Sequence, residues 1–171
     1  MHDVVEGVEL VRLSERMHPR DAGRRCLEEY IRLTDAWVNQ GRPPAELPES
    51  FQRELSAFPG EASPPGGEVL LAYAGARLVG IGQLVPLAGE TCEMRRVYVQ
   101  DHVRRRRLGT WLATSLLDEA RRRGYRRARL HVLASRSTAI RLYQHLGFRV
   151  VEPDRQYPFS MVFMEADLEN P

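Results

Sequence analysis

The chain has 171 residues and a formal net charge of +2, which suits one domain with its own core and gives no overall basic bias toward nucleic acid. All 25 basic residues are arginine, so no lysine can serve as a nucleophile or form a Schiff base. Two cysteines, Cys26 and Cys92, provide no disulfide framework and suit a reducing compartment. No apolar run has the length of a signal peptide or a membrane span, so a cytoplasmic protein without membrane contact is expected.

The first 60 residues predict one strand and two amphipathic helices. Residues 8–13 alternate in the manner of a strand, and apolar side chains from Cys26 to Val38 recur at helical spacing. A second helix is expected over residues 50–58, where Pro59-Gly60 ends it.

The rest of the chain predicts further strands and two more helices. Residues 69–73 and 78–85 form a predicted hairpin that turns at Ala74-Gly75-Ala76. The other predicted elements are a central strand over 92–99, a helix over 108–123, a strand over 128–133, a helix ending at Leu146-Gly147, and strands over 148–151 and 160–166. This order indicates a mixed α/β sheet.

The stretch after the central strand combines a strand end, a basic turn and a helix start. Val97-Tyr98-Val99 closes the strand, Arg104 to Arg107 supply four cations, and Gly109 lies at the start of the helix. Backbone N–H groups of a first helical turn lack partners within the helix, and the helix dipole adds partial positive charge there. Arginines add full charges and forked donors. The stretch therefore predicts a phosphate site.

Two motifs resemble those of the GNAT superfamily of N-acetyltransferases. Arg104-Arg105-Arg106-Arg107-Leu108-Gly109 is similar to the family's acyl-CoA pyrophosphate loop, Arg/Gln-x-x-Gly-x-Gly/Ala, with Arg107 in place of the middle glycine. That glycine lets backbone approach phosphate closely. Residues 139–148 resemble the second signature, Ala-x-x-x-Tyr-x-x-x-Gly-Phe, whose tyrosine position is Tyr143. The resemblance covers roughly residues 68–166.

The resemblance implies a single-domain GNAT-like fold of the α/β (α+β) class over residues 1–171. The motif-bearing core spans residues 68–166, and the helices of residues 20–58 form a substrate-side wall. The central sheet is expected to be mixed, mostly antiparallel and flanked by helices. It is expected to splay between its fourth and fifth strands, 92–99 and 128–133. The wall carries three aromatic residues, Tyr30, Trp37 and Phe51. Each is expected either to line a substrate pocket or to be a core contact of the two amphipathic helices.

The resemblance also implies acetyl-CoA (coenzyme A) as co-substrate in the splayed gap, without a metal. The implied binding residues are Val97, Tyr98, Val99, Arg104, Arg105, Arg106, Arg107, Leu108, Gly109 and Thr110. Backbone N–H groups near residues 97–99 can polarise the thioester oxygen and pair with the pantetheine arm. A second basic run, Arg121 to Arg129, is either a solvated helix end or a contact for the 3′-phosphate.

Glu93 is the predicted general base, because a carboxylate at the start of the central strand can bind an amine and take its proton directly or through a water. The alternatives are a structural glutamate paired with Arg95 and a base supplied by His131, across the gap, or by water alone. Tyr143 is the predicted general acid, since a tyrosine keeps its proton at pH 7 and can donate it to the leaving thiolate. A packing role is the alternative for Tyr143. Cys92 is a less favoured acetyl carrier than direct transfer in a ternary complex.

The sequence therefore predicts an acetyl-CoA-dependent N-acetyltransferase that acylates a primary amine of a small or amino-acid-like molecule. A protein or peptide N-terminus is the alternative acceptor, and a non-catalytic acyl-CoA sensor is the alternative of another class. RNA binding is disfavoured by the near-neutral charge and by the lack of aromatic residues clustered beside the arginines. No cluster has metal-ligand spacing. Homodimers are common in the family, so a homodimer fits the resemblance.

Overall fold

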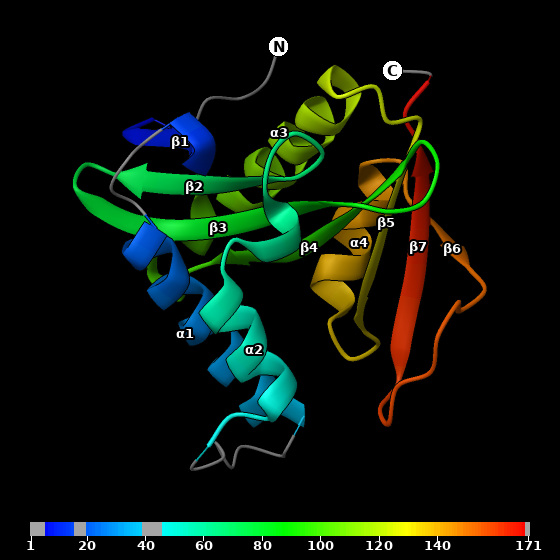
Figure 1. The fold of residues 1–171 in the computed structure, drawn as a ribbon, viewed down its shortest axis with the longest axis horizontal. Helices are drawn as coiled ribbons and strands as arrows, with labels where there is room; N and C mark the ends of the chain where they lie inside the picture. The colour runs from blue at the N-terminus through cyan, green and yellow to red at the C-terminus, as the bar shows by residue number, and fades with distance from the viewer. Residues whose placement is uncertain (1–5, 16–19, 39–45, 170–171) are drawn as a thin grey trace.

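The computed structural model describes residues 6–15, 20–38 and 46–169, except for the side chains of Trp37 and of residues 104–106 (Figure 1). The described strands form one sheet in the order β1-β2-β3-β4-β5-β7-β6. Their bounds are β1 Val8–Arg12, β2 Glu68–Ala74, β3 Arg77–Pro86, β4 Thr91–Val99, β5 Arg127–Leu133, β6 Arg149–Val151 and β7 Met161–Asp167. Among the described strands, only β4 and β5 are parallel neighbours, which confirms the predicted mixed, mostly antiparallel sheet.

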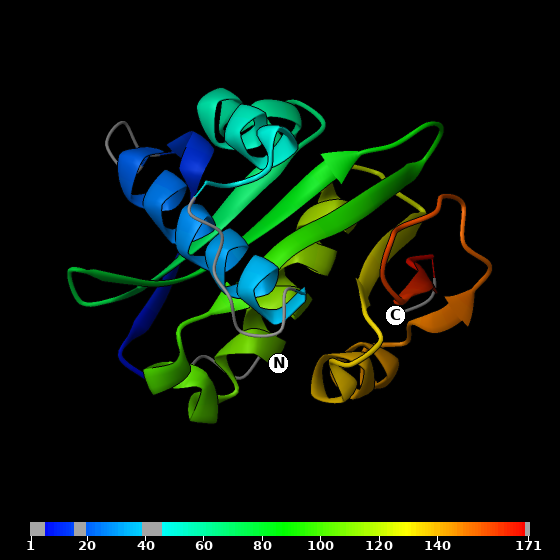
Figure 2. The ribbon, with the colours of Figure 1, turned by 90° about the horizontal axis from the view of Figure 1, so that it is seen from below.

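Helices cover both faces of the sheet (Figures 1 and 2). One face carries α1 (Arg20–Val38) and α2 (Glu49–Ala57), and the other carries α3 (Leu108–Arg122) and α4 (Ser137–His145). Short 3-10 helices occupy Leu13–Glu15 (η1), Gly60–Ala62 (η2) and Asp101–Arg106 (η3). In the part of the chain that the structure describes, no helix combines the length and the apolar character needed to cross a bilayer.

Each face of the sheet has its own apolar core, because the side chains of a strand alternate between faces. The core under α3 and α4 contains Leu84, Met94, Leu112 and Leu116. Contact there is close: a Cβ on Gly82 of β3 would lie 2.7 Å from Leu116 Cδ1, so α3 packs directly against backbone. The core under α1 and α2 contains helix and strand residues: Leu27, Ile31, Leu55, Val69, Leu71, Ile81 and Val85.

The structure differs from the sequence prediction at the basic turn. The arginines after the central strand were expected to open the helix, but residues 104–106 belong to η3 and the α-helix begins only at Leu108. Arg107 separates the two helices with φ 55° and ψ 13°, a left-handed conformation. The chain therefore changes direction at the position where the family has a glycine.

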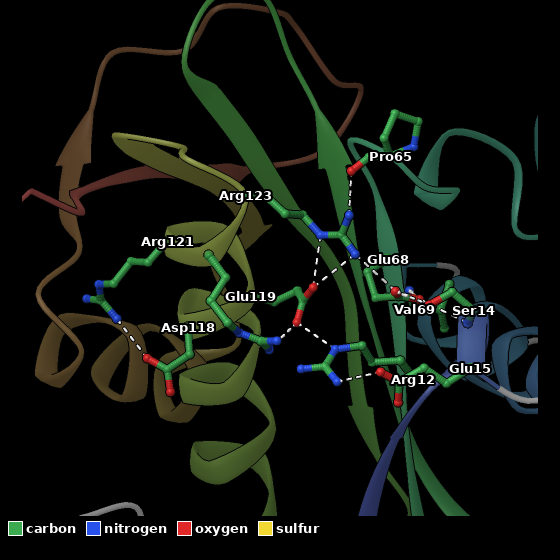
Figure 3. A network of polar contacts seen from close by, with 11 residues as sticks. Arg12, Ser14, Glu15, Pro65, Glu68, Val69, Asp118, Glu119, Arg121 and Arg123 are labelled. Carbon is green, nitrogen blue, oxygen red and sulfur yellow. Dashed lines mark hydrogen bonds and ion pairs between the residues drawn. The ribbon is translucent and has the colours of Figure 1, made fainter.

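The second basic run forms ion pairs at the opposite end of α3 (Figure 3). Arg123 contacts Glu119 at 2.9 Å and Glu68 at 3.0 Å, and Arg12 of β1 donates to Glu119 at 2.9 Å. Glu68 and Glu119 are only 1% and 3% exposed. Arg123 therefore joins the C-terminus of α3 to β2, and it lies at the opposite end of α3 from the basic turn.

Candidate active site

The sheet opens between β4 and β5. Backbone pairing between these parallel strands covers Thr91 with Arg127, Cys92 with Ala128 and Glu93 with Arg129, and ends there. Beyond Glu93, β4 continues to Val99 against β3 on its other side. Figure 2 shows α4, β5, β6 and β7 standing apart from the rest of the molecule. The predicted splay between the fourth and fifth strands is therefore present.

A bulge bends β4 just beyond the last pair with β5. Arg96 has φ 55°, and the register with β3 shifts between the pairs Gln83–Arg95 and Ile81–Tyr98. The Arg96 side chain makes two hydrogen bonds to Glu54 of α2, at 2.9 and 2.7 Å. The bulge turns the end of β4 away from β5, and the ion pair fastens α2 to the bulge.

A cleft of about 560 Å³ occupies the open end of the splay. Its lining residues are Val97, Tyr98, Val99, Arg107, Gly109, Thr110, Ser135, Arg136, Ser137, Thr138, Ala139, Leu142 and Tyr143. The structure thus brings together all three predicted strand residues, three of the predicted loop residues and Tyr143. Leu108 is fully buried in the core instead, and the side chains of Arg104, Arg105 and Arg106 lie outside the described ones.

Two helix N-termini border this cleft. Neither α3 nor α4 has a side-chain cap at its first turn, and neither has an acidic residue there. At the start of α3, the Trp111 N–H donates a hydrogen bond to the Arg107 carbonyl. The N–H groups of residues 108–110 come before this bond, in the part of a helix where N–H groups have no acceptor within the helix. Both helix ends present partial positive charge, which suits a bound anion.

Tyr98 and Arg136 connect the cleft to α1. The Tyr98 hydroxyl donates to Glu29 at 2.7 Å, and burial together with this carboxylate raises the pKa of Tyr98. Arg136, at the start of α4, lies over the ring of Tyr30 with 5.7 Å between its Cζ and the ring centre. Tyr30 and Phe51 pack against the core under α1 and α2, whereas the Trp37 side chain lies outside the described residues.

Tyr143 is buried and forms part of the cleft wall. Its ring packs edge-on against Phe148, with 5.8 Å between ring centres. Burial raises the pKa of Tyr143 above its usual value. The hydroxyl therefore keeps its proton at neutral pH, as a proton donor must.

Glu93 and His131, the two rival candidates for the base, are in direct contact. Glu93 is 2% exposed, and its Oε1 lies 2.8 Å from His131 Nδ1 while Arg95 Nε donates to its Oε2 at 2.5 Å. Burial favours a higher pKa for Glu93, but the His131 hydrogen bond and the charge and hydrogen bond of Arg95 outweigh burial and lower it to about 2. Glu93 is therefore ionised throughout the ordinary pH range.

The ionised carboxylate determines which ring nitrogen of His131 carries the proton. A carboxylate can only accept, so Nδ1 carries the hydrogen and Nε2 has a free lone pair when the ring is neutral. Tyr157, in the loop before β7, lies with its hydroxyl 3.0 Å from His131 Nε2 and donates to it. The imidazole stacks on the rings of Tyr157 and Phe163 at 5.3 and 5.6 Å.

The Arg95–Glu93 contact is the one that the sequence analysis gave as an alternative for Glu93, whereas Tyr157 is a site residue that it did not predict. Arg95 bridges two carboxylates, since it donates to Glu93 and also to Glu61 at 2.8 Å. Tyr157 belongs to a loop in which Phe159 stacks on it at 5.6 Å between ring centres. Two aromatic residues in a short loop were the available signal.

Cys92 is a poor acetyl carrier in this structure. The side chain is fully buried in the core, and burial raises the pKa of its thiol to about 12. A thiol must ionise to act as a nucleophile. Among the described residues, no group of three or more His, Cys, Asp or Glu side chains could hold a metal ion.

Comparisons with known proteins agree with the fold. The model of the Acetyltransferase (GNAT) family matches residues 27–148. An uncharacterized N-acetyltransferase, YjgM of Escherichia coli K12, is 32% identical over 93 residues, which are 53% of this chain and 56% of that protein. The chain thus aligns with little more than half of that relative.

Solved structures extend the likeness over the whole fold. A GNAT acetyltransferase from Staphylococcus aureus Mu50 has a TM-score of 0.75 at 16% identity, covering 95% of this chain and 99% of that one. The PaiA N-acetyltransferase of Thermoplasma acidophilum, solved with coenzyme A, has a TM-score of 0.70 at 23% identity, covering 94% and 98%. With the family model matching most of its length, the chain belongs to the acetyltransferase (GNAT) family of acyltransferases.

Proposed function

We propose that this protein transfers an acetyl group from acetyl-CoA directly to a primary amine of a small molecule. The observation that carries the proposal is that the β4–β5 ladder ends at Glu93. The Glu93–His131 pair lies at that end of the ladder, and the cleft occupies the open part of the splay beyond it. An acyl donor in the cleft and an amine near the pair would meet at the splay. A cytoplasmic location and a homodimer stay predictions.

The cleft has features that fit coenzyme A. Arg107 and the uncapped N-terminus of α3 would hold the pyrophosphate, and the edge of β4 at Val97–Val99 would pair with the pantetheine arm. Bound acetyl-CoA supplies the activated acetyl thioester. The related PaiA structure contains coenzyme A, which supports this use of the cleft.

His131 is the proposed base, and Glu93 positions it. Glu93 is ionised, buried and already bonded to two cationic or polar partners, so it is a weak acceptor for an amine proton. Its contact with Nδ1 fixes the His131 tautomer whose Nε2 lone pair can take a proton, directly or through a water. Tyr157 occupies that lone pair, so the amine or its water must replace the Tyr157 hydroxyl.

Tyr143 is the proposed acid. Its hydroxyl lies in the cleft wall, where the raised pKa keeps it protonated until the thiolate departs. One acetyl group moves to the nitrogen, the amine loses one proton to His131, and coenzyme A leaves as the thiol after gaining one from Tyr143. The two proton transfers balance.

The test combines binding and turnover. Acetyl-CoA should raise the melting temperature, and a panel of primary amines should release free coenzyme A thiol together with an equal amount of acetylated amine. His131→Gln should abolish the acidic limb of the pH–rate profile. Glu93→Gln should lower the rate, because the carboxylate that holds the His131 ring in its tautomer is lost. Acetyl-CoA binding without acetyl transfer to any amine would overturn the proposal in favour of a sensor.

A further inference from the structure

The β6–β7 loop, residues 152–160, is exposed to solvent except at Tyr157, which is partly buried. The Tyr157 ring contacts the rings of His131 at 5.3 Å, Phe159 at 5.6 Å and Phe163 at 6.2 Å between ring centres. Its hydroxyl lies 3.0 Å from His131 Nε2. Tyr157 therefore attaches an otherwise exposed loop to the proposed base.

Two charged side chains of the loop also reach the strands, but their contacts are weak. Asp154 lies 3.4 Å from Arg129, and Arg155 lies 4.0 Å from Glu93. Asp154, Arg129 and Arg155 are each 38% exposed, and ion pairs open to water contribute little to stability. The shorter ion pair, 2.9 Å between Asp154 and Arg155, stays within the loop. The contact of Tyr157 with His131 is therefore the main attachment of the loop to the site.

The Tyr157 hydroxyl occupies the atom that the proposed reaction needs. Glu93 holds the hydrogen of His131 on Nδ1, so the neutral ring has one lone pair, at Nε2. An imidazole nitrogen accepts one hydrogen bond in the ring plane, and here that bond comes from Tyr157. Tyr157 and an incoming amine, or the water that relays its proton, therefore exclude each other at Nε2.

We propose that Tyr157 is a gate on the base. In the closed form its hydroxyl caps His131, and in the open form the β6–β7 loop carries the hydroxyl away and admits the amine or its water. The inference rests on the proposed acetyl transfer, since it concerns the regulation of that same base. It makes Tyr157 a residue that competes with the acceptor and so sets the acceptor's apparent affinity.

The size of this competition follows from the strength of one hydrogen bond. The amine binds the open form only, so its apparent affinity is reduced by the fraction of protein that is open. The net contribution of one neutral hydrogen bond corresponds to roughly a fivefold change in such an equilibrium. The gate should therefore raise the amine KM by about that factor. It should leave kcat unchanged, because every saturated molecule is already open.

Tyr157→Phe keeps the ring and deletes only the capping hydroxyl. At saturating acetyl-CoA, its KM for a primary amine should fall about threefold to tenfold, with kcat close to that of the native protein. Tyr125→Phe is the matched control, because it deletes a hydroxyl that donates to the Gly66 carbonyl at 2.9 Å, and its KM should not change. An unchanged KM in Tyr157→Phe would overturn the gate. A large loss of kcat would overturn it as well, since Tyr157 would then take part in the transfer itself.

A second measurement needs no acetyl transfer. Diethyl pyrocarbonate acylates the free lone pair of a neutral imidazole, and peptide mass mapping gives the rate at each histidine. His131 should react about fivefold faster in Tyr157→Phe than in the native protein, while the exposed His145 of α4 reacts equally in both. Equal rates at His131 would overturn the gate, whatever the enzyme assay gives. If no amine is acetylated but His131 does become more reactive, the proposed function fails and the cap on His131 stands.

Discussion

Arg107 has a backbone conformation that glycine adopts most easily. With φ 55° and ψ 13°, its Cβ approaches backbone atoms that a glycine would not meet. The family has a glycine at this position, so the turn between η3 and α3 keeps the same path with a costlier residue. What the arginine adds is a cation in the wall of the cleft.

The cost at this turn is measurable with two variants. Arg107→Gly should be more stable than Arg107→Ala by about 0.5–1 kcal/mol, because only glycine escapes the left-handed penalty. Both variants lose the guanidinium, so its contacts cancel in the comparison. Urea unfolding midpoints give the difference. Equal stability of the two would mean that residue 107 is not left-handed in solution.

The buried Glu93 carboxylate predicts a particular dependence of stability on pH. The pKa of Glu93 is about 2 in the folded protein, against 4.5 for an unperturbed glutamate side chain. A lowered folded pKa stabilises the protein fully above the unfolded value, and this contribution disappears as pH falls from about 4.5 toward 2. The free energy of unfolding of the native protein should therefore fall more steeply between pH 5 and pH 3 than that of Glu93→Gln. Parallel curves for the two proteins would contradict the lowered pKa.

Tyr143→Phe tests the acid while keeping the ring. The contact with Phe148 should survive, so the free energy of unfolding should change by no more than about 1 kcal/mol. Turnover should fall by about a hundredfold or more, because the leaving thiolate loses its proton donor. An acyl donor with a more acidic thiol should recover part of the loss. Near-normal turnover, with chemistry rate-limiting, would assign Tyr143 a packing role only.

At the scale of the elements, periodicity in the sequence predicted nearly every helix and strand. The helix over residues 108–123 is α3 at Leu108–Arg122, and the hairpin of 69–73 and 78–85 is β2 and β3. Two local features were not predicted, the bulge at Arg96 and the left-handed turn at Arg107. Both place an arginine where local preference favours glycine, so tertiary contacts decide them.

One such contact is the pair between Arg96 and Glu54, which fastens α2 to β4. A double-mutant cycle with Arg96→Met and Glu54→Gln should give a coupling energy of about 1–2 kcal/mol, since the pair is two-pronged and partly buried. Acetyl-CoA affinity should not change in either single variant, because no residue of α2 lines the cofactor cleft. The exposed pair Arg53–Glu49 on the same helix is the control and should show coupling near zero. Coupling no larger than that of the control would show that α2 is held by apolar contacts alone.

At the scale of the whole molecule, the sequence predicted the architecture but only part of the site. Glu93 and His131 were rival candidates, yet the fold makes them partners, because β5 diverges from β4 only after Glu93. Where the ladder stops is set by packing across the sheet and has no local sequence signal.

The ionic network of Figure 3 joins β1 and η1 to β2 and to the C-terminus of α3. Glu68→Gln should destabilise the protein by about 3 kcal/mol, because Arg123 and the Ser14 hydroxyl lose a charged acceptor in a buried position. The urea midpoint measures the loss. Glu49→Gln, at an exposed pair, should stay within about 0.5 kcal/mol. A Glu68→Gln protein as stable as the native one would mean that the network is solvated.

The short β4–β5 junction has a consequence for hydrogen exchange. In the described part of the chain, three strand residue pairs join β1–β4 to β5–β7, so we expect the sheet to open as two cooperative units that share one corner. Local opening at that corner exposes backbone amides of both units without unfolding either. A ligand that bridges Val97–Val99 and α4 would lengthen the shared boundary. The two units would then exchange as one, and the protein's cooperativity would itself depend on whether the cleft is filled.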